Sequence, residues 1–275
     1  MATIPAPTAA SFPSVCRQWR QFRKLSQLDL ALAANVSQRH LSWLETGRSQ
    51  PSRDMVVRLS DALDVPLRER NVLFQSAGFA PAYSESRLED PAMGPVLDAL
   101  NHVLEHHEPL PAVVVDRDWN VIRKNRAADL MLSLGGEPAR LLQETGDPGE
   151  LNLALMTVHP LGLRQYIENW EQAAPAFIRR LKREALASGD PELQARFQRI
   201  IDLAGPLDDS DPLAQSLLPV LPLELNIEGL KLSLFSVIST FGTPQDITTD
   251  ELRIEAFYPA DGATAAFFRG AAATA

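Results

Sequence analysis

Residues 26–51 read SQLDLALAANVSQRHLSWLETGRSQP, and this stretch decides the fold of the N-terminal part. Ser26 and Ser37 are favourable N-caps, because a serine hydroxyl accepts a free backbone N–H in the first turn of a helix. Asn35 tolerates the left-handed conformation, and Gly47 ends the second periodic stretch. The stretch therefore predicts two short helices joined by a tight turn.

Further helices are expected on both sides of this pair. Before it, Val15, Trp19 and Phe22 recur at spacings of four and three, which is the period of an amphipathic helix whose other faces are rich in arginine. No strand signal interrupts the segment. The expected helices span 14–24, 27–34, 38–46, 53–63 and 67–77. Residues 13–80 are thus predicted to form an all-α five-helix bundle.

The order of residues in the opening stretch resembles the helix-turn-helix of XRE-type (Cro/C1) repressors, with Asn35 where such proteins usually have glycine. The resemblance implies a core formed by Leu30, Ala31, Val36, Leu41 and Leu44. It also implies that the second helix of the pair enters the DNA major groove with its N-terminal end. The implied DNA-binding residues are Gln27, Ser37, Gln38, Arg39, Trp43, Arg48 and Arg53.

These residue types suit different parts of DNA. Arg39 and Gln38 can each form paired hydrogen bonds to base edges, whereas the family positions of Gln27, Arg48 and Arg53 contact phosphates. Trp43 has an alternative role, since a partly exposed tryptophan can simply pack against a neighbour. The whole segment also has an alternative interpretation: it could be a small helical bundle with a solvated basic face, or a protein-interaction module.

The charge distribution favours a DNA partner for the N-terminal part. The 275-residue chain has a net charge of −9, yet residues 13–80 carry ten Lys/Arg and six Asp/Glu, a net charge of +4, which leaves −13 for the remainder. A basic module joined to an acidic body is expected when one part meets a phosphate backbone and the other does not. Because one recognition helix reads only a few base pairs, a homodimer on double-stranded DNA is expected.

Composition narrows the class of protein further. Hydrophobic residues make up 45 % and charged residues 22 % of the chain, as in globular proteins. No apolar run is long enough to cross a membrane, no secretory signal is evident, and a single cysteine, Cys16, excludes an intrachain disulfide. We expect a cytoplasmic protein with a disordered tail at 1–12 and a linker at 81–92.

Residues 93–270 are predicted to form an α+β domain with an antiparallel sheet of about five strands. AVVVDRDWNVIRKN (112–125) contains two strand-like runs joined by a turn, and LPLELNI, GLKLSLFSVIS and ELRIEAFYP indicate three more strands late in the chain. Helical patterns lie between and before these strands. They cover approximately 96–106, 126–134, 150–157, 161–172, 175–187 and 191–204.

HEPLPAVVVDRDWNVIRKNRAA (107–128), LNLALMTVHPLGLRQYIENW (151–170) and AGFAPAY (77–83) resemble the MmyB-like regulators, in which an XRE-type helix-turn-helix precedes a PAS-like ligand-binding domain. The resemblance implies a one-component transcriptional regulator whose PAS-like pocket holds a fatty acid or a similar apolar effector, with no cofactor required. Residues that match the family pattern, and are expected at the ligand, are Trp119, Asn120, Asn125, His159, Arg164 and Trp170.

An apolar lining for this pocket is expected from Val114, Ile122, Leu155 and Ile167. A carboxylate head group would meet Arg164 or His159, with Arg164 the better partner because its guanidinium can hold both oxygens. Each assignment has a structural alternative: the tryptophans may be core anchors, and the polar pair may hydrogen-bond loops. The domain as a whole may serve only for dimerisation.

One enzymatic alternative comes from His102-Val103-Leu104-Glu105-His106, which matches the H-x-x-E-H pattern of inverted zinc metalloproteases. Two histidines one helical turn apart could bind zinc while Glu105 activates water. A five-residue pattern arises easily by chance, however, and no nucleophile elbow, P-loop or dinucleotide-binding motif occurs. We therefore expect no catalytic residue and no metal site.

Overall fold

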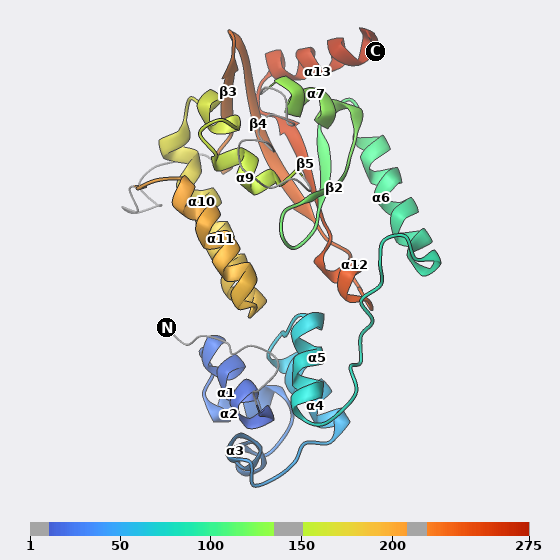
Figure 1. The fold of residues 1–275 in the computed structure, drawn as a ribbon, viewed down its shortest axis with the longest axis vertical. Helices are drawn as coiled ribbons and strands as arrows, with labels where there is room; N and C mark the ends of the chain where they lie inside the picture. Colours follow the sequence, from blue (N-terminus) through green and yellow to red (C-terminus); the bar gives the residue numbers. More distant parts are fainter. Residues whose placement is uncertain (1–10, 135–150, 208–218, 275) are drawn as a thin grey trace. The chain divides into compact units, whose positions relative to one another are not determined.

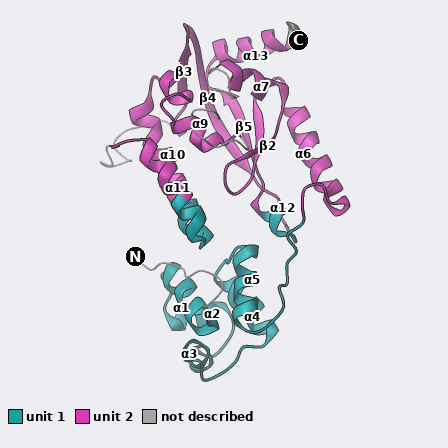
Figure 2. Ribbon diagram, in the orientation of Figure 1, with its two compact units in different colours: residues 1–86, 184–195, 244–250 teal, residues 87–183, 196–243, 251–275 magenta. Residues whose placement is uncertain are grey.

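The computed structural model describes residues 11–134, 151–207 and 219–274. These residues fall into two compact units (Figure 2). Unit 1 comprises Met1–Ser86, Glu184–Ala195 and Pro244–Asp250, and unit 2 comprises Arg87–Arg183, Arg196–Thr243 and Glu251–Ala275. Residues 1–10 of the expected tail lie outside the described residues, and the expected domain boundaries remain a prediction. Among the described helices, none is long and apolar enough to cross a membrane.

The five helices expected at the N-terminus are confirmed. They are α1 (Phe12–Phe22), α2 (Gln27–Ala33), α3 (Gln38–Thr46), α4 (Arg53–Ala62) and α5 (Leu67–Ser76), all drawn in blue and cyan in Figure 1. Ser26 forms a reciprocal capping box with Asp29, and Ser37 accepts a hydrogen bond from the backbone of His40. Asn35 and Gly47 both have positive φ, as the sequence indicated.

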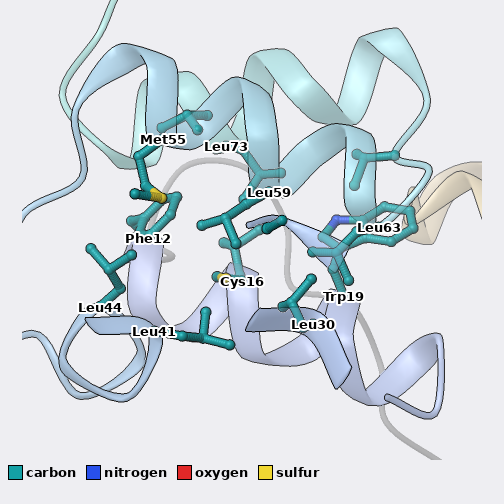
Figure 3. Close-up of a cluster of buried hydrophobic side chains, with 14 of the residues drawn as sticks. Phe12, Cys16, Trp19, Leu30, Leu41, Leu44, Met55, Leu59, Leu63 and Leu73 are labelled. Atoms are coloured by element: carbon teal, nitrogen blue, oxygen red, sulfur yellow. The ribbon is translucent and has the colours of Figure 1, made fainter. Parts of the chain in front are cut away.

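The core of this bundle joins all five helices. Leu30, Leu41 and Leu44 from the α2–α3 pair meet Trp19 of α1 and Leu59 of α4, as Figure 3 shows. These side chains are almost completely buried, which fixes the crossing of α2 and α3 through close packing. The core predicted from the helix-turn-helix register is therefore confirmed.

Cys16 also lies inside this core. Burial, assisted by the negative charge of Glu45, raises the pKa of the Cys16 thiol to about 12. The thiol is consequently protonated at neutral pH and acts as a small apolar group.

A buried ion pair ties α1 to α3. Glu45 is 1 % exposed, and its two carboxylate oxygens accept hydrogen bonds from Nε and Nη2 of Arg20 at 2.6 and 2.8 Å. Gln27 donates a third hydrogen bond to Oε2 at 2.8 Å, and Arg17 donates to the backbone carbonyl of Glu45 at 2.6 Å. Burial alone would raise the pKa of Glu45, but the hydrogen bonds from Arg20 and Gln27 and the arginine charges hold it below its ordinary value.

Unit 2 is built on the expected five-stranded antiparallel sheet. Its strands are β1 (Ala112–Val115), β2 (Val121–Lys124), β3 (Leu223–Ile227), β4 (Leu230–Ser239) and β5 (Arg253–Pro259), in the order β2-β1-β5-β4-β3. Two hairpins, β1–β2 and β3–β4, are therefore joined through the central strand β5. This arrangement is visible in Figure 1.

The helices of unit 2 are α6 (Gly94–His107, preceded by the short helix η1, Pro91–Met93), α7 (Arg126–Leu134), α9 (Leu153–Val158), η2 (Leu163–Tyr166), most of α10 (Trp170–Ser188), the later part of α11 (Pro191–Leu203) and α13 (Gly262–Thr274). Helix α12 (Ile247–Glu251) and the first residues of α11, up to Ala195, group with unit 1, except for the last residue of α12. Helix α13, which the sequence analysis did not anticipate, packs against β4 and β5. Helix α10 contributes to both units, because its residues from Glu184 onward group with unit 1.

Alternate residues of β5 face opposite sides of the sheet. Ile254 and Ala256 pack with Leu100 and Leu104 of α6, whereas Glu255 and Phe257 border a cavity on the other side. Strand β5 therefore contributes to a packed apolar layer on one face of the sheet and to the wall of a cavity on the other.

The helix expected at 161–172 is wrong. The short 3-10 turn η2 forms first, Ile167 then pairs with Leu225 of β3 as an isolated antiparallel bridge, and the α-helix α10 begins only at Trp170. The side chain of Asn169 accepts from the backbone N–H of Glu224 and donates to the carbonyl of Pro222. Since these contacts use the backbone as a strand would, tertiary pairing overrides the local helical pattern.

The Glu45 ion pair gives a first prediction about stability. Replacing Glu45 by Gln leaves Arg20 without its buried counter-ion, which should lower the opening free energy of α1 and α3 by about 3–5 kcal/mol at pH 7. The pKa of Glu45 is lower in the folded than in the unfolded state. The whole difference in opening free energy between the natural protein and the variant is therefore expected above pH ~4.3, the ordinary pKa of glutamate. This difference should shrink as the pH falls through the pKa of Glu45 in the folded state. Native-state hydrogen exchange of the full-length chain, resolved by peptide, measures it.

The matched control is Asp54→Asn, which removes an acid that pairs with Arg58 on the exposed face of α4. Exposed helix pairs contribute about 0.3–0.5 kcal/mol, so this variant should change exchange little. Equal losses for the two variants would contradict the role assigned to Glu45.

Candidate functional site

The outer face of α3 carries the residues expected at DNA bases. Leu41 and Leu44 are fully buried on one side of this helix, so the opposite side faces solvent. Ser37, Gln38 and Arg39 are exposed at its N-terminal end. The arrangement is the one that the helix-turn-helix register predicted, although the DNA contacts themselves remain predictions.

Arg39 and Trp43 form one surface feature on this face. The Arg39 Cζ lies 4.6 Å from the centroid of the Trp43 ring, one helical turn away, and Trp43 is 37 % exposed. A guanidinium stacked on an indole face is attracted by the ring's quadrupole. The Trp43 ring therefore restrains the guanidinium of Arg39 on this face of α3.

The three residues expected at phosphates have different surroundings. Arg48 is exposed just after α3, and Arg53 is exposed at the start of α4, where its guanidinium stacks over Phe74 at 4.7 Å. The side-chain amide of Gln27 instead donates to the buried carboxylate of Glu45. Gln27 is thus tied into the ion pair that fixes α3.

The basic outer face expected on α1 is smaller than the sequence suggested. Arg20 pairs with Glu45, and Arg23 donates through Nε to the carbonyl of Leu63 at 2.7 Å. A buried acid at position 45 gives little signal in the sequence, because a glutamate near the end of a short helix usually faces solvent.

Unit 2 contains a cavity of about 270 Å³ between the sheet and the helices on one of its faces. Its walls come from the β1–β2 turn, α9, η2, α10, the segment before β3, and strands β3, β4 and β5. The described lining residues are Trp119, Leu153, Thr157, Leu163, Ile167, Trp170, Ala173, Ala174, Ala176, Phe177, Arg180, Leu221, Leu223, Leu234, Phe235, Ser236, Glu255 and Phe257. The lining is therefore mostly apolar with a few polar groups, as in small-molecule sites.

Two charged residues stand among this apolar lining. Nη1 of Arg180 lies 3.8 Å from Oε1 of Glu255, and Glu255 is only 6 % exposed. The Arg180 guanidinium also lies over the Trp119 ring, 4.3 Å from its centroid. The sequence analysis missed both residues, because Arg180 lies in a charged helical run and Glu255 alternates with apolar residues as an outward-facing strand residue would.

Trp119 reaches the cavity because of the β1–β2 turn. Its φ is 70°, a left-handed conformation that is strained for a large residue, and the carboxylate of Asp116 holds the turn by accepting from the backbones of Asp118 and Asn120. Burial raises the pKa of the Asp116 carboxyl above its ordinary value, although the hydrogen bonds from Asp118 and Asn120 act in the opposite direction. The Trp119 ring then packs edge-on against Phe177 of α10 at 5.3 Å.

Three of the residues expected at the ligand line the cavity: Trp119, Ile167 and Trp170. Val114 and Ile122, in contrast, belong to the cluster on the α6 side of the sheet. The sequence indicates that alternate strand residues face opposite sides of the sheet, but it does not show which side borders the cavity.

Asn125, one of the polar residues expected at the ligand, makes hydrogen bonds to the backbone. Asn125 is buried, accepts from the backbones of Ala112 and Ala128, and donates to the carbonyls of Leu104 and Leu110. It joins α6, β1 and α7. Its conspicuous place after β2 therefore has a structural explanation.

The remaining expected residues also lie outside the described cavity lining. Arg164 donates to the carbonyl of Leu203 at 2.7 Å and stacks over Trp170, and His159 accepts from the backbone of Leu161. Asn120 hydrogen-bonds Asp116, and Leu155 lies on α9. A ligand role for these four residues, like the one for Asn125, Val114 and Ile122, stays a prediction.

His102, Glu105 and His106 lie exposed on α6. Nδ1 of His106 contacts the carbonyl of His102 at 2.8 Å, and Nδ1 of His102 contacts the carbonyl of Asp98. In the part of the chain that the structure describes, no group of three or more His, Cys, Asp or Glu side chains is placed to hold a metal ion.

Comparison with known proteins identifies two matching families. Residues 17–70 match the helix-turn-helix family model, and residues 96–270 match that of the MmyB-like transcription regulator ligand binding domain. No curated protein matches the chain. A solved structure entitled "Structure of an RNA-binding Light-Oxygen-Voltage Receptor" aligns at 12 % identity and a TM-score of 0.25, over 93 % of this chain and 60 % of that one.

The exposed face of α3 gives a second prediction. Once a target is selected from random duplex DNA, Arg39→Ala should lose about 1–3 kcal/mol on that target and relax specificity at one base position, because it removes a base contact. Arg53→Ala should weaken binding to the target and to unrelated DNA sequences by about the same factor. Fluorescence anisotropy at one fixed salt concentration measures both.

Arg58→Ala is the control, since Arg58 pairs with Asp54 away from the predicted base contacts. An Arg39→Ala protein that loses as much affinity for random DNA as for the target would show that Arg39 does not read a base.

Proposed function

The chain belongs to the MmyB-like transcription regulators, and we propose that it is a one-component regulator whose affinity for DNA is set by an apolar effector in the cavity of unit 2. The helix-turn-helix supplies DNA binding, and the ligand-binding domain supplies the response to a small molecule. The single observation that supports the effector is the cavity of about 270 Å³, whose described lining is mostly apolar.

The chemistry of the cavity suits a molecule with a long apolar part, such as a fatty acid. Burying apolar surface contributes about 25 cal/mol per Å², and aromatic walls from Trp119, Trp170 and Phe177 offer wide surfaces for that purpose. Among the described lining residues, the cationic side chain is that of Arg180 rather than the expected Arg164 or His159. No cofactor is needed for this function.

Regulation requires the effector to bind the DNA-competent and DNA-incompetent states with different affinities. Helix α10 is a candidate for the element that distinguishes the two states. Trp170, Phe177 and Arg180 of this helix line the cavity, so a ligand there would contact α10 directly.

The DNA partner favours a homodimer, because a two-fold assembly presents two recognition helices to a palindromic site. The alternative function is a DNA-binding protein whose unit 2 only dimerises. If unit 2 only dimerises, its cavity should bind nothing. A layer of side chains without a cavity would have supported that alternative.

We expect the purified protein to release a lipid-like molecule on solvent extraction, detected by mass spectrometry. Ala173 lines the cavity, so Ala173→Phe should fill part of it and lower the amount released at least about tenfold, because the added ring competes for the same volume. DNA binding should persist, since the helix-turn-helix is untouched.

Gln172→Phe is the matched control, because it places the same ring on the neighbouring, exposed position of α10. It should release as much as the natural protein. Absence of any released molecule, together with no binding of added apolar compounds, would support the purely dimerising alternative.

A further inference from the structure

The outer face of α3 presents an apolar group beside a polar one. Trp43 is 37 % exposed, whereas Leu41 and Leu44 of the same helix are completely buried. The guanidinium of Arg39, one turn earlier, lies over the Trp43 ring, with Cζ 4.6 Å from the ring centroid. A ligand that meets Arg39 on this face therefore also meets the indole.

We propose that Arg39 and Trp43 together read one base step: Arg39 reads a guanine, and Trp43 reads the C5-methyl group of a pyrimidine in the neighbouring base pair. Thymine and 5-methylcytosine both carry that methyl group. The inference rests on the proposed function, because it assumes that α3 enters the major groove. It adds the chemistry of the base step that the helix recognises.

The stacked arrangement determines which edge of Arg39 can meet a base. Stacking on the indole uses a flat face of the guanidinium, and its five N–H groups point outward in its plane. Two donors in that plane match O6 and N7 of guanine, the commonest specific contact of arginine in DNA. In such a contact the guanidinium lies close to the plane of the guanine.

The same stacking places the indole at the level of the next base pair. Successive base pairs are about 3.4 Å apart along the DNA axis. The 4.6 Å between Cζ of Arg39 and the Trp43 centroid is a similar separation, since it also includes any sideways offset. When the guanidinium is coplanar with a guanine, the indole is displaced by about one base step and lies beside the edge of the neighbouring pair.

The chemistry of the indole selects the group that it can recognise there. Base edges in the major groove carry hydrogen-bond donors and acceptors, and the C5-methyl of thymine is the apolar group among them. An indole has one N–H donor and no acceptor, so its exposed ring gains most from an apolar contact. Contact with the methyl group removes apolar surface of both partners from water.

The test uses the full-length protein and a target selected from random duplex DNA. The base position at which Arg39→Ala relaxes specificity identifies the guanine, and we expect thymine in an adjacent base pair. Replacing that thymine by deoxyuridine removes a single methyl group. The natural protein should lose about fourfold in affinity for each half-site so changed, a factor that corresponds to ~0.8 kcal/mol. Fluorescence anisotropy at one fixed salt concentration measures it.

The two sources of the methyl group are separated at the same position. A cytosine–guanine pair placed there should bind more weakly than the thymine–adenine pair, and 5-methylcytosine should restore about fourfold, because it presents the same methyl group. A loss with deoxyuridine without a gain from 5-methylcytosine assigns the site to thymine alone.

Two variants at position 43 connect the methyl group to the indole. Trp43→Ala should abolish the difference between thymine and deoxyuridine, whereas Trp43→Phe, which keeps an aromatic face, should retain at least about twofold. Leu32→Ala is the matched control, since it shortens another exposed apolar side chain of unit 1 and should leave the full difference. Deoxyuridine at a thymine outside the protected site should change the affinity of none of these proteins.

Equal affinity of the natural protein for the thymine and deoxyuridine targets would overturn the inference and leave the proposed function standing. An undiminished difference in Trp43→Ala would also overturn it, as would relaxed specificity of Arg39→Ala at a base other than guanine. If no duplex is selected over random DNA, the proposed function fails and the inference fails with it. If Trp43→Ala does not fold, Trp43→Phe and the comparison on the natural protein decide.

Discussion

The N-terminal module depends on one buried carboxylate. Glu45 is on the recognition helix, and the two hydrogen bonds from Arg20 and the one from Gln27 connect it to α1 and to the first helix of the pair. Apolar packing could hold these helices together in several closely related positions, whereas a bidentate hydrogen-bonded pair has one favourable geometry. Because a helix must be placed within fractions of an ångström to read base edges, this pair would link the stability of the module to the DNA specificity that we propose for it.

Unit 2 meets a different constraint, since its sheet must support both a packed layer and a cavity. Strand β5 does both by alternation: Ile254 and Ala256 complete the layer against α6, and Glu255 and Phe257 face the open side. A buried glutamate on a central strand is expensive without a partner. Arg180 from α10 supplies that partner, so the helix that covers the cavity is held to the sheet by the same charges that define its polar side.

Local signals predicted much of this protein. Serine caps, the positive φ of Asn35 and Gly47, and strand alternation gave the five helices and the five strands, because each depends on neighbouring residues alone. The failures required long-range information. Residues 161–172 were predicted to be helical, but Ile167 pairs with Leu225 far along the chain. Val114 lies in the cluster with α6 rather than in the described lining of the cavity, a placement that the sequence alone does not show. Conspicuous motif residues such as Asn125 and Arg164 hold backbone carbonyls, whereas the inconspicuous Arg180 and Glu255 face the cavity.

The contrast between Arg164 and Arg180 shows why the class of ligand depends on such placement. A guanidinium whose donors are used by a carbonyl, as with Arg164 and Leu203, contributes its charge to the fold. Arg180 instead lies beside the carboxylate of Glu255 in the cavity lining, with 3.8 Å between Nη1 and Oε1, so its charge is placed where a ligand of the cavity would meet it.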